Sequence, residues 1–223
     1  MLRIASAIAC LALLAAPAAS AQVISLDEGS FTLYRDGERI GREDFSIRSA
    51  PGSDGRVLVA QATQAIGIRR TAPGFNADTT GFPVRYQREI RDDGQLVESY
   101  SGQAAHDRYS SRLIQSDGES AREFRLPPGT VASDDDIVHQ LWFIARRGAG
   151  ATVSVLVPRR NVVETVRVEL VGKEHLSIDL RQFETIRLAL RGPAGAVREV
   201  WVGPDGRILK AAIPALRLIA LRD

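Results

Sequence analysis

The feature that most constrains the fold of this chain is the dipeptide Asp-Gly, which occurs five times between runs of alternating or β-branched residues. Asp-Gly favours the type I′ turn, which joins two antiparallel strands and requires positive φ at both central residues. Its repetition therefore predicts a series of β-hairpins. The five pairs are Asp36-Gly37, Asp54-Gly55, Asp93-Gly94, Asp117-Gly118 and Asp205-Gly206.

About a dozen segments between these turns and other Gly or Pro breaks have the alternation typical of strands. The alternation slips at Gly41, which predicts a β-bulge there. Residues 152–157 and 162–171 flank a turn at 158–161 in the same style. No internal repeat or low-complexity linker interrupts the series, so we expect one β-rich domain over residues 22–223.

Residues 133–148 lack the alternation typical of strands and predict a helix over 134–147. Ser133 could cap its N-terminus, three aspartates at 134–136 suit its first turn, and two arginines at 146–147 suit its last. Apolar side chains cover a wide arc, so most of the helix surface should be buried. We therefore expect an all-β fold with one helix, in which an antiparallel, strongly curved sheet or open roll packs on the helix. A closed small barrel or sandwich is the alternative.

The first 21 residues indicate the compartment. Arg3 precedes an apolar run over residues 4–17, and Ala19-Ser20-Ala21 is a small-x-small cleavage site. The pattern predicts a signal peptide over residues 1–21 and a periplasmic or secreted protein that begins at Gln22. The predicted leader holds the chain's single Cys and single Met, so the mature protein would contain neither a disulfide nor a thiolate metal site.

Charge and hydropathy narrow the choice of partners. The chain has 29 Lys+Arg and 27 Asp+Glu, and its arginines are spread along the sequence instead of clustering as a nucleic-acid surface requires. Outside the leader, the longest apolar stretch, residues 211–221, is broken by Pro214 and Arg217, whereas a spanning helix needs about 20 apolar residues. We expect neither nucleic-acid binding nor an integral membrane span.

Two groups of residues raise the question of catalysis or metal binding. Asp135 and His139 are four residues apart and would share a helix face, but two mixed ligands define no known metal geometry. Their alternative role is structural. His106 and Asp107 are neighbours on a predicted strand and would point to opposite faces, and no nucleophile elbow is present. We expect no metal, no cofactor and no assigned catalytic residue.

Five residues are candidates for ligand binding. Trp201 could line a groove in which Arg207 or Lys210 meets an anionic head group, although a core tryptophan beside solvated bases fits the pattern too. Trp142 on the predicted helix and Phe75 in a Gly- and Asn-rich segment are further aromatic candidates. Loops on a rigid sheet often carry binding function.

The C-terminal part of the chain resembles a family of uncharacterised bacterial envelope proteins known only as a domain of unknown function. The resemblance covers about residues 130–223 and rests on four segments: the Asp-led helix, Gly172-Lys173-Glu174, residues 183–187, and the run from Val200-Trp201 through Asp205-Gly206 to Lys210. It implies a fold and a compartment, but no reaction. The plan of a curved sheet on a helix is also similar to that of periplasmic lipoprotein carriers, in architecture alone.

Three functions are consistent with these patterns. The first is a non-enzymatic envelope protein that binds an apolar or lipidic ligand, or a lipidated protein, between sheet and helix. The second is a periplasmic hydrolase using His106, His139 or His175 with acidic neighbours. The third is a structural or assembly protein of the envelope that binds other proteins through an exposed sheet edge.

Overall fold

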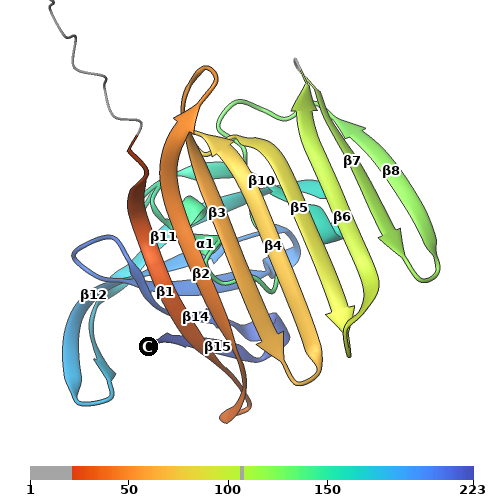
Figure 1. The fold of residues 1–223 in the computed structure, drawn as a ribbon. Helices are drawn as coiled ribbons and strands as arrows, with labels where there is room; N and C mark the ends of the chain where they lie inside the picture. The colour runs from red at the N-terminus through yellow and green to blue at the C-terminus, as the bar shows by residue number, and fades with distance from the viewer. Residues whose placement is uncertain (1–21, 106–107) are drawn as a thin grey trace, which may run out of the picture.

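Fifteen strands form one open sheet in the computed structural model, which describes residues 22–105 and 108–223 (Figure 1). The spatial order is β8-β7-β6-β5-β4-β3-β2-β1-β15-β14-β13-β12-β11-β10-β9, so the first and last strands of the chain pair at its middle. All neighbours are antiparallel except β9 and β10. The predicted signal peptide and the pair His106-Asp107 lie outside the described residues.

The first half of the sheet is a meander of eight strands. They are β1 (Ile24–Arg35), β2 (Glu38–Gly52), β3 (Gly55–Ile66), β4 (Arg69–Asp78), β5 (Pro83–Asp92), β6 (Gln95–Ala105), β7 (Arg108–Gln115) and β8 (Gly118–Phe124). The second half holds the short strand β9 (Val131–Ala132), the helix α1 (Leu141–Ala145), β10 (Thr152–Val157), β11 (Val162–Ile178), β12 (Arg181–Arg191), β13 (Val197–Val202), β14 (Ile208–Ile213) and β15 (Leu218–Arg222). Three 3₁₀ turns, η1 (Pro158–Arg160), η2 (Pro193–Gly195) and η3 (Pro214–Leu216), join strands in this half.

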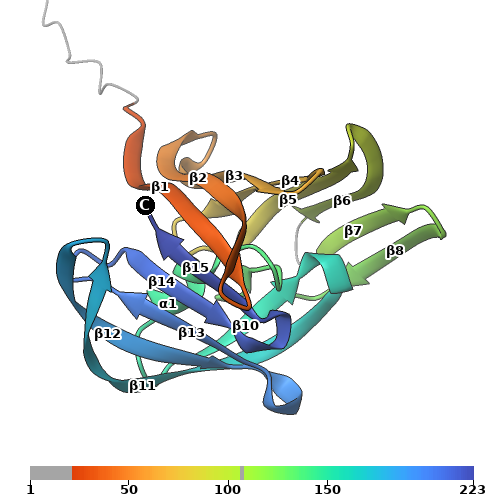
Figure 2. The ribbon, with the colours of Figure 1, turned by 90° about the horizontal axis from the view of Figure 1, so that it is seen from below.

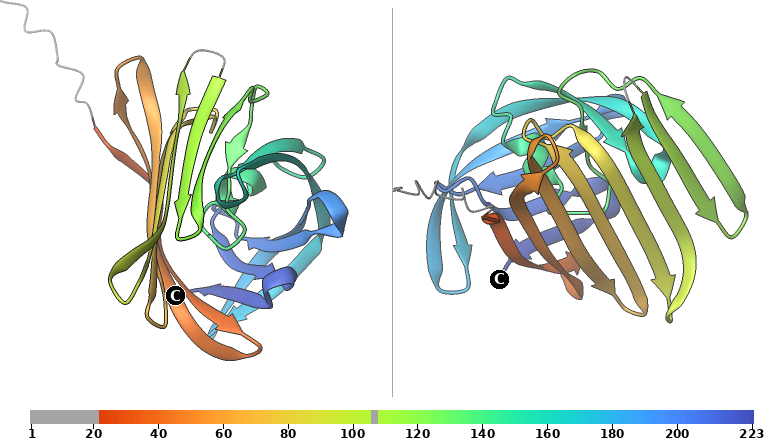
Figure 3. Two further views of the ribbon diagram at one scale, coloured as in Figure 1. Left: turned by 90° about the vertical axis from the view of Figure 1, so that its right-hand side faces the viewer. Right: turned by 45° about the horizontal axis from the view of Figure 1, so that its top comes forward.

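The sheet curves so that its two halves face each other, with α1 between them (Figures 2 and 3). Side chains of alternating strand positions fill the space inside the curve, from Phe31 and Leu33 on β1 to Val200 on β13 and Ala220 on β15. The predicted all-β class, with a strongly curved sheet and a single helix, is confirmed.

The Asp-Gly pairs mark turns between strands as expected. Asp36-Gly37 and Asp93-Gly94 have positive φ at both positions, as a type I′ turn requires. The bulge predicted near Gly41 is present, because the register between β1 and β2 shifts at this point. A Cβ on Gly41 would lie 2.0 Å from the carbonyl oxygen of Ala65, so this position excludes any side chain.

The predicted helix over residues 134–147 is wrong in extent, because only Leu141–Ala145 is α-helical. Gln140, not Ser133, occupies the N-cap position. Residues 133–140, which we term the connector, run from β9 to α1 as turns and bends, and the backbone N–H of Ser133 donates to Leu156 O at 3.0 Å. The aspartates of the connector are held by arginines of the sheet and do not stabilise a helix dipole.

The short helix is embedded in the core. All five of its residues are buried, and the Phe143 ring lies 4.7 Å from the Phe75 ring of β4. Trp142 meets Phe143 edge-to-face at 4.9 Å between ring centroids. Side chains therefore fill the contact between α1 and the sheet.

Candidate functional site

The connector is anchored by a single buried carboxylate, that of Glu43 on β2. Glu43 accepts the backbone N–H groups of Val138 and His139 at 3.0 and 2.8 Å. It also contacts Nδ1 of the His139 imidazole at 2.9 Å and accepts Nε2–H of Gln64 at 3.1 Å. Backbone, imidazole and amide groups thus surround the two carboxylate oxygens of Glu43. Glu43 thereby ties the connector to the first half of the sheet.

A second buried pair lies beside the first. Arg88 on β5 donates to Asp134 at 2.7 Å and to both oxygens of Asp136 at 3.0 Å. Asp134 also accepts the hydroxyl of Tyr86 at 2.8 Å and the backbone N–H of Arg159 at 2.7 Å. The side chains of Arg88 and Asp134 are fully shielded from solvent. Two separated segments of the sheet therefore converge on the connector.

Burial and the charge of Arg88 act in opposite directions on the pKa values of the aspartates in this cluster. Burial raises the pKa of Asp134 despite the Arg88 charge beside it, and burial together with Asp134 raises the pKa of Tyr86 well above its usual value. Burial acts in the same direction on Asp136, but its ion pair with Arg88 outweighs it and lowers the pKa. In this cluster, the ion pairs and hydrogen bonds therefore offset the free-energy cost of burying the charged groups.

The connector corrects two hypotheses. Asp135 binds Arg160 and Arg198, at 2.7 and 2.5 Å, while His139 binds Glu43, so these two residues do not share a metal site. The described residues hold no group of three or more His, Cys, Asp or Glu that could bind a metal ion. Nε2 of His139 is buried without a hydrogen-bond partner among the described residues, and the residue is 1% exposed.

The aromatic candidates Phe75 and Trp142 lie in the interior. Phe75 is 3% exposed and stacks between Phe143 and Tyr86. Trp142 is 8% exposed, and the guanidinium of Arg146 covers its ring at 4.3 Å. Both residues build the core, and neither faces an open groove.

Trp201 and Lys210 lie together on the outer face of the second half, as their pairing in the register requires. The ammonium of Lys210 is 4.3 Å from the Trp201 ring centroid, and Arg187 covers the ring at 4.9 Å. The indole N–H donates to Glu174 at 2.7 Å. This hydrogen bond and one from Arg187 lower the pKa of Glu174. The ring is thus covered by the protein's own charged side chains.

Arg207 is the one predicted candidate that lines an open cleft. The cleft lies between the tip of the β11–β12 hairpin and the ends of β14 and β15, and its volume is about 610 Å³. The hairpin stands away from the rest of the sheet in Figures 1 and 2. We call this hollow the tip cleft; it is lined by Ile178, Asp179, Leu180, Arg181, Phe183, Asp205, Arg207, Leu209, Arg222 and Asp223.

The tip cleft combines an apolar wall with charged side chains of both signs, in which three arginines are set against three aspartates. Leu180 is fully exposed at the hairpin tip, and Ile178 and Phe183 are half-buried. Arg222 is paired with the buried Asp27 at 2.7 Å, whereas Arg207 lies 3.6 Å from the same carboxylate and is half exposed. Arg222 already neutralises Asp27, and Arg207 forms a second, solvent-exposed ion pair with Asp205 at 3.5 Å. Such an exposed pair is weak, and a ligand carboxylate can replace it.

Asp223 closes one side of the tip cleft. Partial burial would raise the pKa of its side chain, but hydrogen bonds from Thr32 and Ser30 and the charge of Arg42 lower it. Its carboxylate is therefore occupied by β1 and β2, and the lining carboxylate that pairs with Arg207 is that of Asp205, at 3.5 Å.

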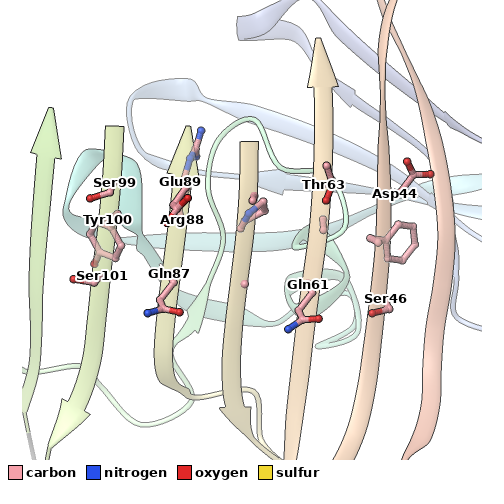
Figure 4. Close-up of a pocket in the computed structure, with 15 residues that line it drawn as sticks. Asp44, Ser46, Gln61, Thr63, Gln87, Arg88, Glu89, Ser99, Tyr100 and Ser101 are labelled. Carbon is pink, nitrogen blue, oxygen red and sulfur yellow. The ribbon is translucent and has the colours of Figure 1, made fainter. Parts of the chain in front are cut away.

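A separate hollow lies on the outer face of the first half (Figure 4). Its volume is about 710 Å³, and it crosses β2 to β6. We call it the outer hollow; it is lined by Asp44, Phe45, Ser46, Gln61, Ala62, Thr63, Ala72, Pro73, Gly74, Gln87, Arg88, Glu89, Ser99, Tyr100 and Ser101. Phe45, Arg88 and Tyr100 belong to the buried strand positions, so the outward-facing members determine its chemistry.

Comparison with known proteins identifies the fold. No family model matches the chain, and no curated protein sequence matches it. Among solved structures, the chain is similar to the crystal structure of a β-barrel-like protein of the domain of unknown function DUF1849 from Brucella abortus. The TM-score is 0.55 at 11% sequence identity, and the match covers 88% of this chain and 94% of that chain. The predicted resemblance to an uncharacterised domain-of-unknown-function family is confirmed at the level of fold.

Sequence reasoning found Arg207 but missed the apolar wall of its cleft. Leu180 and Phe183 belong to a hairpin whose two-residue turn contains no glycine, so no Asp-Gly signal marked it. Alternating Leu176, Ile178 and Phe183 could have indicated a half-buried hairpin, but nothing local shows that it faces residues 205–209.

Proposed function

We propose that the protein is an exported, non-catalytic binding protein of the cell envelope that holds an amphiphile in the tip cleft. The proposal rests on one observation: Leu180, Phe183 and the half-exposed guanidinium of Arg207 line the same open cleft. An acyl chain would lie along the apolar wall, and its anionic head group would pair with Arg207. This moves the expected ligand site from the filled contact between helix and sheet to the hairpin.

Two further observations support a binding role over hydrolysis. His139 is sealed in the core, and His175 lies on an exposed strand position of the hairpin, where no described hydrogen bond connects it to a nucleophile. A hydrolytic site requires a nucleophile and a base within hydrogen-bond reach of each other.

No helix in residues 22–105 or 108–223 is long and apolar enough to cross a membrane.

The proposal is tested by calorimetric titration with palmitate. Phe183→Ser removes the apolar wall and should weaken binding at least about tenfold, equivalent to roughly 1.4 kcal/mol. Leu96→Ser is the matched control, because Leu96 is 51% exposed on β6, in the other half of the sheet. Equal affinity of both variants for palmitate, or no binding by the unmodified protein, would overturn the proposal.

The head group is tested separately. Arg207→Gln should weaken palmitate binding while leaving binding of the uncharged dodecanol unchanged, since only the ion pair is removed. A loss of both ligands would show that Arg207 shapes the cleft and does not recognise the charge. Export is tested by the mass of the protein recovered from the periplasm, which we expect to begin at Gln22.

A further inference from the structure

The outer hollow has a regular geometry set by the register of its strands. Ser46, Gln61, Gly74, Gln87 and Ser101 are successive cross-strand partners from β2 to β6. A parallel row lies beside it, in which Ala72 is paired with Glu89 and Glu89 with Ser99. Strands are spaced about 4.8 Å apart, so each row runs for roughly 19 Å across the sheet.

Small residues create the depth of the hollow. Gly74 and Ala72 lie at its middle, while longer side chains stand on either side, as Figure 4 shows for Gln61 and Gln87. A Cβ on Gly74 would meet nothing closer than the Gln61 side chain, at 3.8 Å. The space above Gly74 is therefore open and is not required by the packing of the sheet.

The polar side chains of the hollow have unused hydrogen-bonding capacity. Within the described residues, the side chains of Gln61, Gln87, Thr63 and Ser101 make no hydrogen bond. The two carboxylates at the rim are occupied, because Asp44 accepts from Arg42 at 2.6 Å and Glu89 from Arg91 at 2.9 Å. The hollow thus offers neutral donors and acceptors on a rigid sheet.

This chemistry selects the class of ligand. A membrane surface or a protein hot spot requires exposed apolar or aromatic side chains, and the outward-facing positions of the hollow have none larger than Ala72. A nucleic acid requires a basic surface, whereas the charged side chains at the rim are carboxylates. Rows of amides and hydroxyls match a chain of neutral, hydroxyl-rich units.

We propose that the outer hollow binds a neutral glycan strand that lies across β2 to β6. Gln61 and Gln87 project from the two strands that flank β4, and each amide both donates to and accepts from sugar hydroxyls. Gly74 between them lets the sugar approach the sheet. The site lies on the opposite face of the sheet from the connector and is independent of the tip cleft.

The test is binding of a panel of neutral glycans, namely cellopentaose, chitopentaose and maltopentaose, measured by calorimetry. We expect at least one to bind, and Gly74→Val to abolish its binding because the side chain occupies the open space above position 74, at the middle of the hollow. Valine suits a strand, and Gly74 has no positive φ, so the variant should fold, which its thermal unfolding checks.

Gln61→Ala together with Gln87→Ala should weaken binding at least about tenfold, whereas Gln103→Ala, an exposed position on β6 outside the hollow, should leave it unchanged. The idea is overturned if no glycan of the panel binds, or if folded Gly74→Val binds as well as the unmodified protein. If the unmodified protein binds lipid vesicles or peptides and Gly74→Val does not, the hollow binds another ligand, and the glycan proposal is overturned as well. Palmitate binding in the tip cleft should not change in any of these variants.

Discussion

The connector and the tip cleft contain the same residue types and differ in access to solvent. In the cluster around the connector, Arg88 and Asp134 are fully shielded and paired with each other, and Asp134 also accepts from Tyr86 and from the backbone of Arg159. In the tip cleft, Arg207 is half exposed; it shares the carboxylate of Asp27 with Arg222 and forms an exposed ion pair with Asp205. Buried charges that are paired with one another fix a structure, whereas exposed charged groups can recognise a ligand.

The largest effect we predict is on the connector. Arg88→Leu leaves Asp134 buried without its counter-charge, so the free energy of unfolding should fall by about 3–5 kcal/mol. The measurement is urea denaturation followed by circular dichroism. Arg112→Leu is the control: its ion pair with Glu119 is exposed, so its loss should change the free energy of unfolding far less than the loss of Arg88. Similar costs for both variants would contradict the difference between buried and exposed pairs.

A smaller loss should follow when one donor to Glu43 is removed. Gln64 donates to Glu43 at 3.1 Å and to the Asp136 carbonyl oxygen at 2.7 Å. Gln64→Leu should therefore lower the free energy of unfolding by about 1–3 kcal/mol. Gln61→Leu on the same strand, but on the opposite and exposed face, should change it by no more than about 0.5 kcal/mol. If the two variants are equally stable, Glu43 does not need its full set of donors.

The tip cleft should show the reverse behaviour, with function affected and stability preserved. Leu180→Asn alters a fully exposed side chain, so the free energy of unfolding should change by less than about 0.5 kcal/mol. Palmitate affinity should nevertheless fall, because the apolar wall is shortened. A variant that loses stability but keeps its affinity would place Leu180 among the structural residues.

The smallest predicted effect is spectroscopic and concerns Glu174, beside Trp201. Its pKa is lowered by hydrogen bonds from Trp201 and Arg187, so the Trp201 indole proton should shift with a midpoint below about 4.3, the ordinary glutamate value. Because the folded-state pKa is the lower one, the contribution of Glu174 to stability is present above its unfolded pKa and is lost as the pH falls through the folded pKa. Nuclear magnetic resonance follows the shift, and Glu174→Gln should abolish it. A midpoint at or above about 4.3 would contradict the hydrogen bond.

The hairpins were predictable because their signals are local. Asp36-Gly37 and Asp93-Gly94 adopt the positive φ angles that type I′ turns demand, and Gly41 lies at a bulge that the slip in alternation indicated. The wide apolar arc of residues 137–145 correctly predicted burial. Each of these features depends on residues within one turn or one strand.

The connector and the site were not predictable in the same way, because their partners are distant in sequence. Asp134 and Asp136 suit a helix N-terminus locally, yet Arg88 and Glu43 lie far upstream and hold this segment in turns. Arg207 was identified from a family-like run, but its cleft exists only because residues 178–183 fold back toward β14. Tertiary contacts overrode local propensity in the first case and created the site in the second.

The most direct test of ligand binding at the hairpin is photo-crosslinking with a diazirine derivative of palmitate, mapped by mass spectrometry. We predict crosslinks in residues 178–183 and 205–209, reduced in Phe183→Ser and retained in Leu96→Ser. Crosslinks confined to α1 or the connector would place the acyl chain between helix and sheet and would contradict the assignment of the tip cleft.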